Sequence, residues 1–308
     1  MKLACIVPIF NFLGDATIEA NHAAAIAKLA EPTVDIYPIR AVAHSVPQEN
    51  DFIAPTHSIL WQKEALINYA ISQLFTDYDA IAWIDSGIYL EPGWSHRVLR
   101  ALETYDVVQC YNEGVWLNPK GDVSSTRDGY VHNLLKGIQQ QRGKPKPSVG
   151  AAWAAKSETL KHFRLYDRAI VGGGDTWFLN GVLGVDTPEA LVTRHQTEAQ
   201  RTQIGEWIEN TRAKRFRVGY TIDKYTHLWH MDPDQRQHTT RHKILVNHDF
   251  NPELCTQVAP TGTLEWTPMA TPGLIEDVKK FLTARVSPPE YSKKTLYKPD
   301  PQPTENQD

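Results

Sequence analysis

The side chains best suited to acid–base chemistry or cation binding fall in three short stretches of the chain. The first holds Asp85, which directly follows the apolar run 80–84 and so stands at the end of a predicted buried strand. A carboxylate at that place can bind a ribose hydroxyl or a metal ion. A solvated aspartate at a strand end has the same pattern, so Asp85 alone leaves both interpretations open.

The second stretch is a glycine-rich turn, Gly172-Gly173-Gly174, followed by Asp175. Consecutive glycines let the backbone approach a ligand closely and turn sharply into a helix. Gly173 and Gly174 are therefore candidate ligand contacts. Asp175 is well placed to take a proton from a hydroxyl group. The alternative is an ordinary hinge in which Asp175 caps the helix.

The third stretch holds His227 and His230, followed by Asp232, Arg236 and Arg241. Imidazole and carboxylate ligands together suit Mn²⁺, whereas Mg²⁺ prefers oxygen ligands. Two histidines three residues apart do not specify a zinc site without a third ligand. The alternative is that one histidine packs in the core and the other lies on the surface.

The composition indicates a soluble α/β protein with one large or two smaller domains. The chain has 308 residues, 41% of them hydrophobic, which is enough for a sizeable core. A formal charge of −4 gives no overall attraction to nucleic acid or anionic membranes. Three widely spaced cysteines predict neither a disulfide framework nor a cysteine-based zinc site. We find no signal peptide and no apolar run near the ~20 residues of a membrane span, and expect a cytoplasmic protein.

Apolar runs and helical periodicities alternate along the first half, which predicts a mostly parallel sheet flanked by helices. The predicted strands are 3–7, 34–39, 80–84 and 107–111. The predicted helices are 14–29, 58–75, 157–163, 175–183, 188–217, 236–247 and 274–284. Ligands of such sheets bind beyond the carboxyl ends of the strands, where Asn11 and Asp85 would lie.

Two segments stand apart in composition. Residues 118–148 are polar and predict irregular structure, with an exposed loop at 139–147. Residues 287–308 are rich in proline, lysine and acidic residues and predict a disordered tail. The folded domain would therefore span residues 1–286.

The order and spacing of the three stretches resemble glycosyltransferases of the GT-A fold, especially the branch related to galactosyltransferase C-terminal regions and its bacterial and phage-encoded relatives. Residues 3–284 carry the resemblance. It implies a Rossmann-like α/β domain that moves a sugar from a nucleotide-diphosphate donor, most simply a UDP-sugar, to an acceptor hydroxyl. By the same resemblance the reaction inverts the anomeric centre, with Asp175 as the general base.

The resemblance also implies the remaining site residues. Donor contacts would come from the loop after the first strand, the helix before Asp85 and the arginines near the histidines: Pro8, Phe10, Asn11, Lys63, Asn68, Asp85, Arg236 and Arg241. Acceptor contacts would come from the small-residue stretch 150–154 and the glycine turn, namely Trp153, Gly173, Gly174 and Asp175. Asp85, His227 and His230 would bind Mn²⁺ or Mg²⁺. Gly87 stands where the family places the second acid of its Asp-x-Asp motif, which weakens this metal site.

The acceptor stays open between a glycan and a hydroxymethylated base in DNA. Residues 118–165 hold more basic than acidic side chains, and a basic rim could receive a phosphate-bearing acceptor. Some phage relatives modify DNA bases, and such a protein would work in the host cytoplasm. A solvated loop would show the same composition. A module that binds nucleotides or glycans without catalysis is the other alternative, because Gly87 interrupts the acidic motif.

Overall fold

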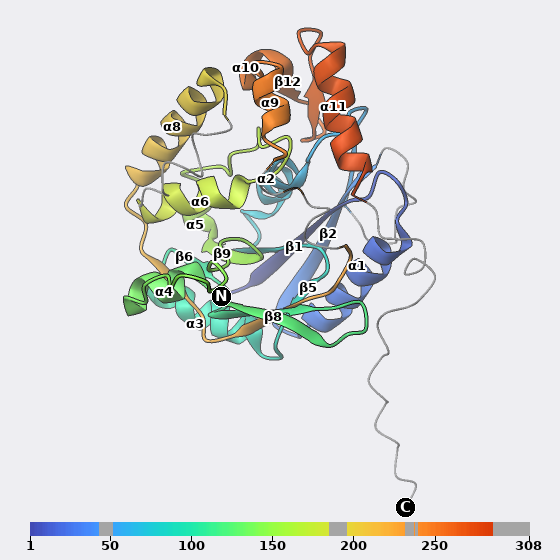
Figure 1. The fold of residues 1–308 in the computed structure, drawn as a ribbon. Coiled ribbons are helices and arrows are strands. Elements are labelled where there is room, and N and C mark those ends of the chain that lie inside the picture. Colours follow the sequence, from blue (N-terminus) through green and yellow to red (C-terminus); the bar gives the residue numbers. More distant parts are fainter. Residues whose placement is uncertain (43–51, 185–195, 232–236, 238–239, 286–308) are drawn as a thin grey trace, which may run out of the picture.

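A computed structural model describes residues 1–42, 52–184, 196–231, 237 and 240–285 (Figure 1). Its centre is a seven-stranded sheet in the order β10-β6-β9-β4-β1-β2-β3. The strands, in chain order, are β1 Leu3–Phe10, β2 Val34–Val42, β3 Phe52–Pro55, β4 Ala80–Ile84, β6 Val107–Gln109, β9 Ala152–Lys156 and β10 Val218–Tyr220. Four of them, β1, β2, β4 and β6, lie where the sequence predicts strands.

The sheet is mostly parallel, as predicted. β1 pairs in parallel with β2 and β4, β2 with β3, and β6 with β10. The exception is β9, which runs antiparallel between β4 and β6. The α/β class, with a mostly parallel sheet flanked by helices, is therefore confirmed.

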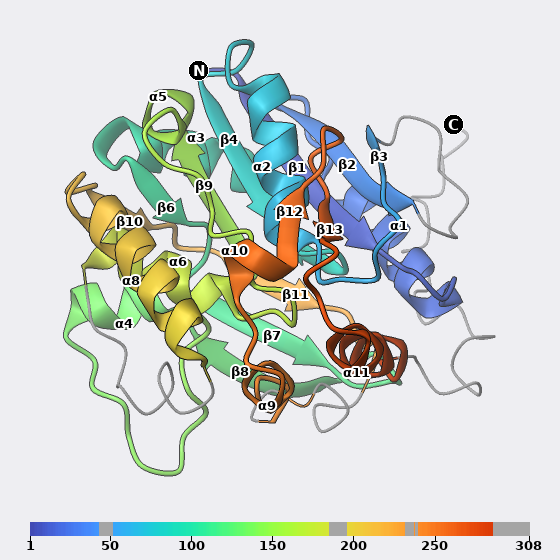
Figure 2. The same ribbon diagram turned by 90° about the horizontal axis from the view of Figure 1, so that it is seen from above.

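Ten helices surround the sheet in the described part of the chain (Figures 1 and 2). They are α1 Ala16–Leu29, α2 Lys63–Leu74, α3 Trp94–Thr104, α4 Tyr130–Lys136, α5 Ser157–Leu160, α6 Gly174–Leu183, α8 Glu198–Arg212, α9 Lys243–Asn247, α10 Pro252–Cys255 and α11 Pro272–Thr283. None of the described helices is long and apolar enough to cross a membrane.

The side chains of β1 show why helices cover both faces of the sheet. Leu3, Cys5 and Val7 point to the face where α1 and α3 pack. Ala4 and Ile6 point to the opposite face, against α2 and α6. All five are fully buried. Successive strand residues alternate between faces, so a continuous apolar run needs a cover on each side.

A second sheet lies beside the first, in the order β5-β11-β7-β8. Its strands are β5 Ile88–Leu90, β7 Glu113–Leu117, β8 Val123–Asp128 and β11 Lys224–His227. It corrects the prediction of irregular structure for 118–148, since β8 and α4 both fall in that segment. The exposed loop that was predicted at 139–147 is present. Because β11 ends at His227, this sheet places the histidine pair.

The last quarter of the chain packs on the segment before the glycine turn. Ile170 and Val171 are buried against apolar side chains of α9 and α11 and of the hairpin β12 Thr256–Val258 and β13 Leu264–Trp266. The predicted helix 188–217 is shorter than expected, with α8 covering 198–212, and residues 188–195 lie outside the described part. The predicted helix 236–247 is described only as α9. The tail 287–308 also lies outside the described residues.

Candidate active site

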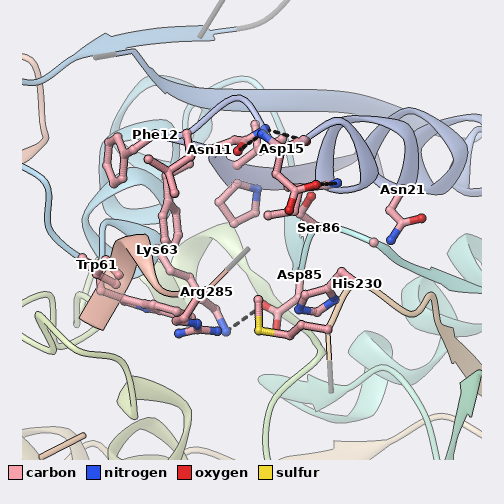
Figure 3. Close-up of a pocket in the computed structure, with 18 of the residues that line it drawn as sticks. Asn11, Phe12, Asp15, Asn21, Trp61, Lys63, Asp85, Ser86, His230 and Arg285 are labelled. Atoms are coloured by element: carbon pink, nitrogen blue, oxygen red, sulfur yellow. Dashed lines mark hydrogen bonds and ion pairs between the residues drawn. The ribbon is translucent and has the colours of Figure 1, made fainter. Parts of the chain in front are cut away.

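A cavity of about 390 Å³ opens at the carboxyl ends of β1 and β4 (Figure 3). The chain continues from β1 to β2 on one side and returns to β4 on the other, so the strand order reverses at this point. Open α/β sheets bind their ligands at such reversal points. The volume falls in the range of about 300–1,000 Å³ that is typical of small-molecule sites.

The cavity brings together most of the residues that the sequence singles out. Those that line it are Pro8, Phe10, Asn11, Lys63, Asp85, Gly173, Asp175, His227, His230 and Arg241. They come from segments up to 233 positions apart in the chain, as Pro8 and Arg241 show. The glycine turn, the strand-end acid and the histidine pair therefore face one space.

Asp175 stands in the first turn of α6, but it does not cap the helix. The cap residue is Gly173, whose φ of 107° lies in the left-handed region that favours glycine. This excludes the interpretation of Asp175 as an ordinary N-cap. Its carboxylate instead accepts two hydrogen bonds from Lys63 Nζ, at 2.8 and 3.0 Å. The helix N-terminus also favours negative charge at this position.

Lys63 joins the two acids of the cavity. Its Nζ lies 2.7 Å from Asp85 Oδ1 and 2.8 Å from Asp175 Oδ1. The lysine side chain is only 7% exposed, whereas the two carboxylates are about one-third exposed. Lys63 begins α2, and the preceding Gln62 is fixed by its amide, which bonds both backbone groups of Leu264 at 2.8 Å. The contacts of Gln62 therefore fix the start of α2, from which the Lys63 side chain reaches both acids.

The charges of this cluster depend on one another. Burial lowers the pKa of Lys63, but the nearby charges of Asp175 and Asp85 outweigh it and hold the pKa above its usual value. Burial raises the pKa of Asp85, and Lys63 opposes that shift. Burial also raises the pKa of Glu64, the next residue of α2, to about 8. Lys63 is therefore charged at neutral pH.

Arg241 adds a second cation to the cavity. Its side chain is 8% exposed, and its Nε has no hydrogen-bond partner among the described residues. Burial lowers the pKa of Arg241, and the charges of Glu64 and Asp175 oppose the shift. A buried guanidinium with an unsatisfied donor is costly unless a ligand binds it. Arg241 therefore suits an anionic ligand group such as a phosphate.

The loop after β1 forms the other wall. The Phe10 ring meets the Trp61 ring edge to face, with centroids 4.9 Å apart. The Trp61 indole Nε1 is buried and has no partner in the described part of the chain. Asn11 lines the cavity, but its amide is occupied by the loop itself, bonding the backbone N and O of Asp15 at 2.9 Å. Asn11 therefore shapes the wall, and Trp61 is a cavity residue that the sequence analysis did not select.

The histidine pair lies on the loop that follows β11. The rings of His227 and His230 stack with centroids 5.2 Å apart. Asn21 of α1 holds this loop by donating to the backbone oxygen of Trp229 at 2.8 Å. Leu228 N donates to Gly87 O at 2.9 Å. The pair is thereby attached to the turn that carries Asp85.

The residues present do not fit the divalent metal that the family resemblance implies. The described residues contain no group of three or more histidine, cysteine or acidic side chains that could hold a metal ion. Gly87 has a φ of 77°, in the left-handed region that favours glycine, and it brings no carboxylate to the position of the second acid in the family motif. The Lys63 ammonium also stands between the two carboxylates that a cation would use. Asp85, His227 and His230 line one cavity without forming a metal-binding set.

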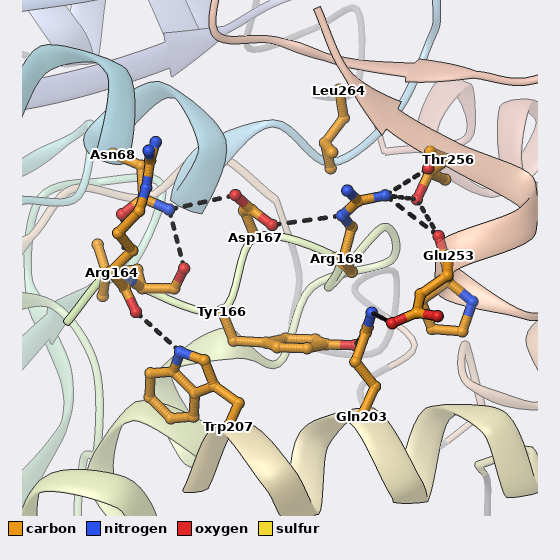
Figure 4. A network of polar contacts seen from close by, with 12 residues as sticks. Asn68, Arg164, Tyr166, Asp167, Arg168, Gln203, Trp207, Glu253, Thr256 and Leu264 are labelled. Carbon is orange, nitrogen blue, oxygen red and sulfur yellow. Dashed lines mark hydrogen bonds and ion pairs between the residues drawn. The ribbon is translucent and has the colours of Figure 1, made fainter. Parts of the chain in front are cut away.

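Two predicted contacts lie outside the cavity. Trp153 is 1% exposed and packs edge to face on Phe178 in the core, because odd-numbered residues of β9 face that side of the sheet. Asn68 bonds both backbone groups of Leu165, at 2.8 and 2.9 Å, and reaches Asp167 at 3.3 Å (Figure 4). It supports the segment that leads to the glycine turn. Neither side chain lines the cavity, and the contacts of both are with other parts of the protein.

The remaining predicted positions are Gly174 and Arg236. Gly174 does not line the cavity, and a Cβ there would lie 2.2 Å from Glu64 Oε1, so its glycine allows α2 and α6 to approach closely. Arg236 lies outside the described residues. Lysines and arginines of the basic loop 139–147 are exposed and do not line the cavity.

No protein-family model matches the sequence, and no curated protein matches it. Solved structures give distant matches. TarS from S. aureus is 12% identical, with 80% of this chain and 40% of that chain covered and a TM-score of 0.41. This chain thus spans about two-fifths of the length of TarS.

Two further matches are described with bound ligands. Glucosyl-3-phosphoglycerate synthase from Mycobacterium tuberculosis, in complex with Mn²⁺, UDP-glucose and phosphoglyceric acid, is 12% identical, with 87% and 86% of the two chains covered and a TM-score of 0.40. GalNAc-T7 with UDP, GalNAc and Mn²⁺ is 8% identical, with 80% and 48% covered and a TM-score of 0.44. Identities and TM-scores this low describe only a distant likeness.

Proposed function

We propose that the protein is a glycosyltransferase that moves a sugar from a nucleotide-diphosphate donor to an acceptor hydroxyl. The observation that supports this most directly is the placement of the Asp175 carboxylate beside two buried cations, Lys63 and Arg241, in one cavity at a strand-order reversal. A diphosphate needs cationic partners, and the hydroxyl that replaces it needs a base. The cavity supplies both kinds of group.

Each residue then has a role in the transfer. Lys63 and Arg241 bind the diphosphate and offset the charge that grows on it as the bond to the sugar breaks. Asp175 takes the proton of the acceptor hydroxyl while that oxygen attacks the anomeric carbon from the face opposite the diphosphate. The anomeric centre is inverted in such a direct displacement. Phe10 and Trp61 offer an aromatic wall for the nucleobase.

To bind the diphosphate, Lys63 has to divide its N–H donors between the two carboxylates and the diphosphate oxygens. An ammonium has three N–H groups, and in the free protein they meet Asp85 and both oxygens of Asp175. A diphosphate oxygen can replace one of the two Asp175 contacts. Donor binding would then free one carboxylate oxygen of Asp175 for the acceptor proton, so the base would become available once the donor is in place.

A donor screen tests the proposal. UDP and several nucleotide-sugars at millimolar concentration should raise the melting temperature, because a ligand at a hundred times its dissociation constant adds about 2.7 kcal/mol of stability. Release of UDP from the matching UDP-sugar should accompany the shift. A shift without any turnover would support the non-catalytic module instead. Absence of a shift with every nucleotide diphosphate would refute the nucleotide site.

The acceptor is proposed only as a hydroxyl compound, with a glycan as the simplest case. The DNA alternative depends on the basic loop, whose Arg142, Lys144 and Lys146 lie outside the cavity. If DNA is the acceptor, neutralising the three should weaken DNA binding and lower its salt dependence by up to about 0.9 for each phosphate that the loop no longer neutralises. With a glycan acceptor the same change should leave transfer unaltered.

A further inference from the structure

We propose that Lys63 takes the place of a divalent cation in this cavity, so that the donor diphosphate is bound and released without a metal ion. This inference rests on the proposed function, since it concerns how the same site holds its donor. A metal ion in such a site would link protein carboxylates to the diphosphate. The Lys63 ammonium already contacts the carboxylates that a metal ion would bind, at 2.7 Å from Asp85 and 2.8 Å from Asp175.

The position of Lys63 leaves no room for a second cation between the acids. Both carboxylates direct an oxygen at the same nitrogen, and one of them directs two. A divalent ion bound to those oxygens would lie within a few ångströms of the ammonium, where repulsion between like charges is strong in a partly buried site. The lysine would have to leave, but its side chain is 93% buried, with its stem enclosed at the start of α2.

The rest of the cavity favours the same conclusion. A metal ion that kept Asp85 would need further ligands, and the neighbouring turn offers Gly87 in place of an acid. Among the described residues no third acidic, histidine or cysteine ligand completes a metal-binding group. Arg241, with its unsatisfied Nε, supplies a second fixed positive charge at the cavity. Lys63 and Arg241 therefore offer a diphosphate two cationic hydrogen-bond partners that belong to the protein.

The first test measures Mn²⁺ binding to the free protein by electron paramagnetic resonance, in which the signal of hydrated Mn²⁺ falls as the ion binds. The parent protein should leave the signal unchanged at millimolar protein and ion. Lys63→Ala should bind Mn²⁺, because its two carboxylates then face each other without a cation. The matched control is Lys156→Ala, which removes a lysine from an ion pair with Asp106 outside the cavity and should behave as the parent.

The second test measures the dissociation constant of UDP by calorimetry, in EDTA and in Mn²⁺. For the parent the two values should agree. For Lys63→Ala the affinity in EDTA should fall about ten- to hundredfold, since a charge-assisted hydrogen bond to the diphosphate is removed, and Mn²⁺ should restore much of it. Lys63→Arg, which keeps the charge, should stay insensitive to EDTA even if its affinity changes.

The outcomes separate the inference from the function. Parent protein that binds Mn²⁺ tightly, or that binds UDP at least about tenfold more weakly in EDTA, overturns the metal-free site and leaves a metal-dependent glycosyltransferase. UDP binding that ignores EDTA supports the inference. If Lys63→Ala does not fold, the parent measurements still decide the matter. Failure of UDP and all other nucleotide diphosphates to bind in either buffer refutes the proposed function, and the inference with it.

Discussion

Gly150 offers a way to move Asp175 without changing its chemistry. A Cβ added at Gly150 would lie 2.5 Å from Asp175 Oδ2 and 2.7 Å from its Cγ. Ordinary contact begins at 3.4 Å, so Gly150→Ala must displace the carboxylate by about 1 Å. The backbone has little freedom to relieve the clash, because the buried Tyr111 hydroxyl donates to Gly150 O at 2.7 Å.

The expected cost follows from that displacement. A misplacement of about 1 Å in a reacting group costs roughly a hundredfold in rate, which corresponds to about 2.7 kcal/mol in the barrier. The 2.8 Å bond between Asp175 and Lys63 would be strained by the same movement. The diphosphate contact of Arg241 comes from a different segment, so UDP affinity should change little.

The assay is UDP release from the UDP-sugar identified in the donor screen, with UDP binding measured in parallel. Gly205→Ala is the matched control, because the same substitution there meets no atom within 4 Å. It should keep the parent rate and gain up to about 1 kcal/mol of stability from the better helix former in α8. Parent turnover in Gly150→Ala, with the protein folded, would refute the claim that the position of Asp175 sets the rate.

Three further predictions concern single side chains of the cluster. Asp175→Asn should lose about 10²- to 10⁴-fold in rate with UDP binding retained; a parent rate would leave Asp175 only its pairing with Lys63. Arg241→Gln should weaken UDP binding about ten- to hundredfold by calorimetry, and an unchanged affinity would separate Arg241 from the diphosphate. Burial raises the pKa of Glu64 to about 8 from 4.5, so the folded protein holds a proton that the unfolded chain releases, and stability falls as the pH rises between these values. Glu64→Gln should therefore match the parent in urea unfolding at pH 4.5 and exceed it by up to a few kcal/mol at pH 9; parallel stability curves would contradict the raised pKa.

Hydrophobic periodicity was enough to predict most of the central sheet. The buried runs at 3–7 and 80–84 read as strands because parallel strands covered on both faces are continuously apolar. Their carboxyl ends could then be assigned to the ligand site, and the cavity lies there. Asp85 was found in this way, as the residue that directly follows a predicted strand.

The antiparallel strand β9 shows where local patterns failed. Its sequence, Ala152–Lys156, is a run of small residues around one tryptophan, and the family resemblance implies acceptor binding for the overlapping stretch 150–154. The structure places it between β4 and β6, where Ala152 and Ala154 face one core and Trp153 the other. Only the pairing of distant strands reveals that role.

The chemistry of the cavity depends on the contact between Lys63 and Asp175, which the spacing of residues in the sequence does not predict. Lys63 and Asp175 are 112 positions apart, and they meet because Asn68, also on α2, holds the segment that leads into the glycine turn. Asp85 reaches the same ammonium from the end of β4. By the family resemblance, Asp85 and the histidine pair imply a metal site and Asp175 a general base. Once Lys63 lies between the acids, it offsets part of their negative charge, and the same residues become a site whose cation is part of the chain.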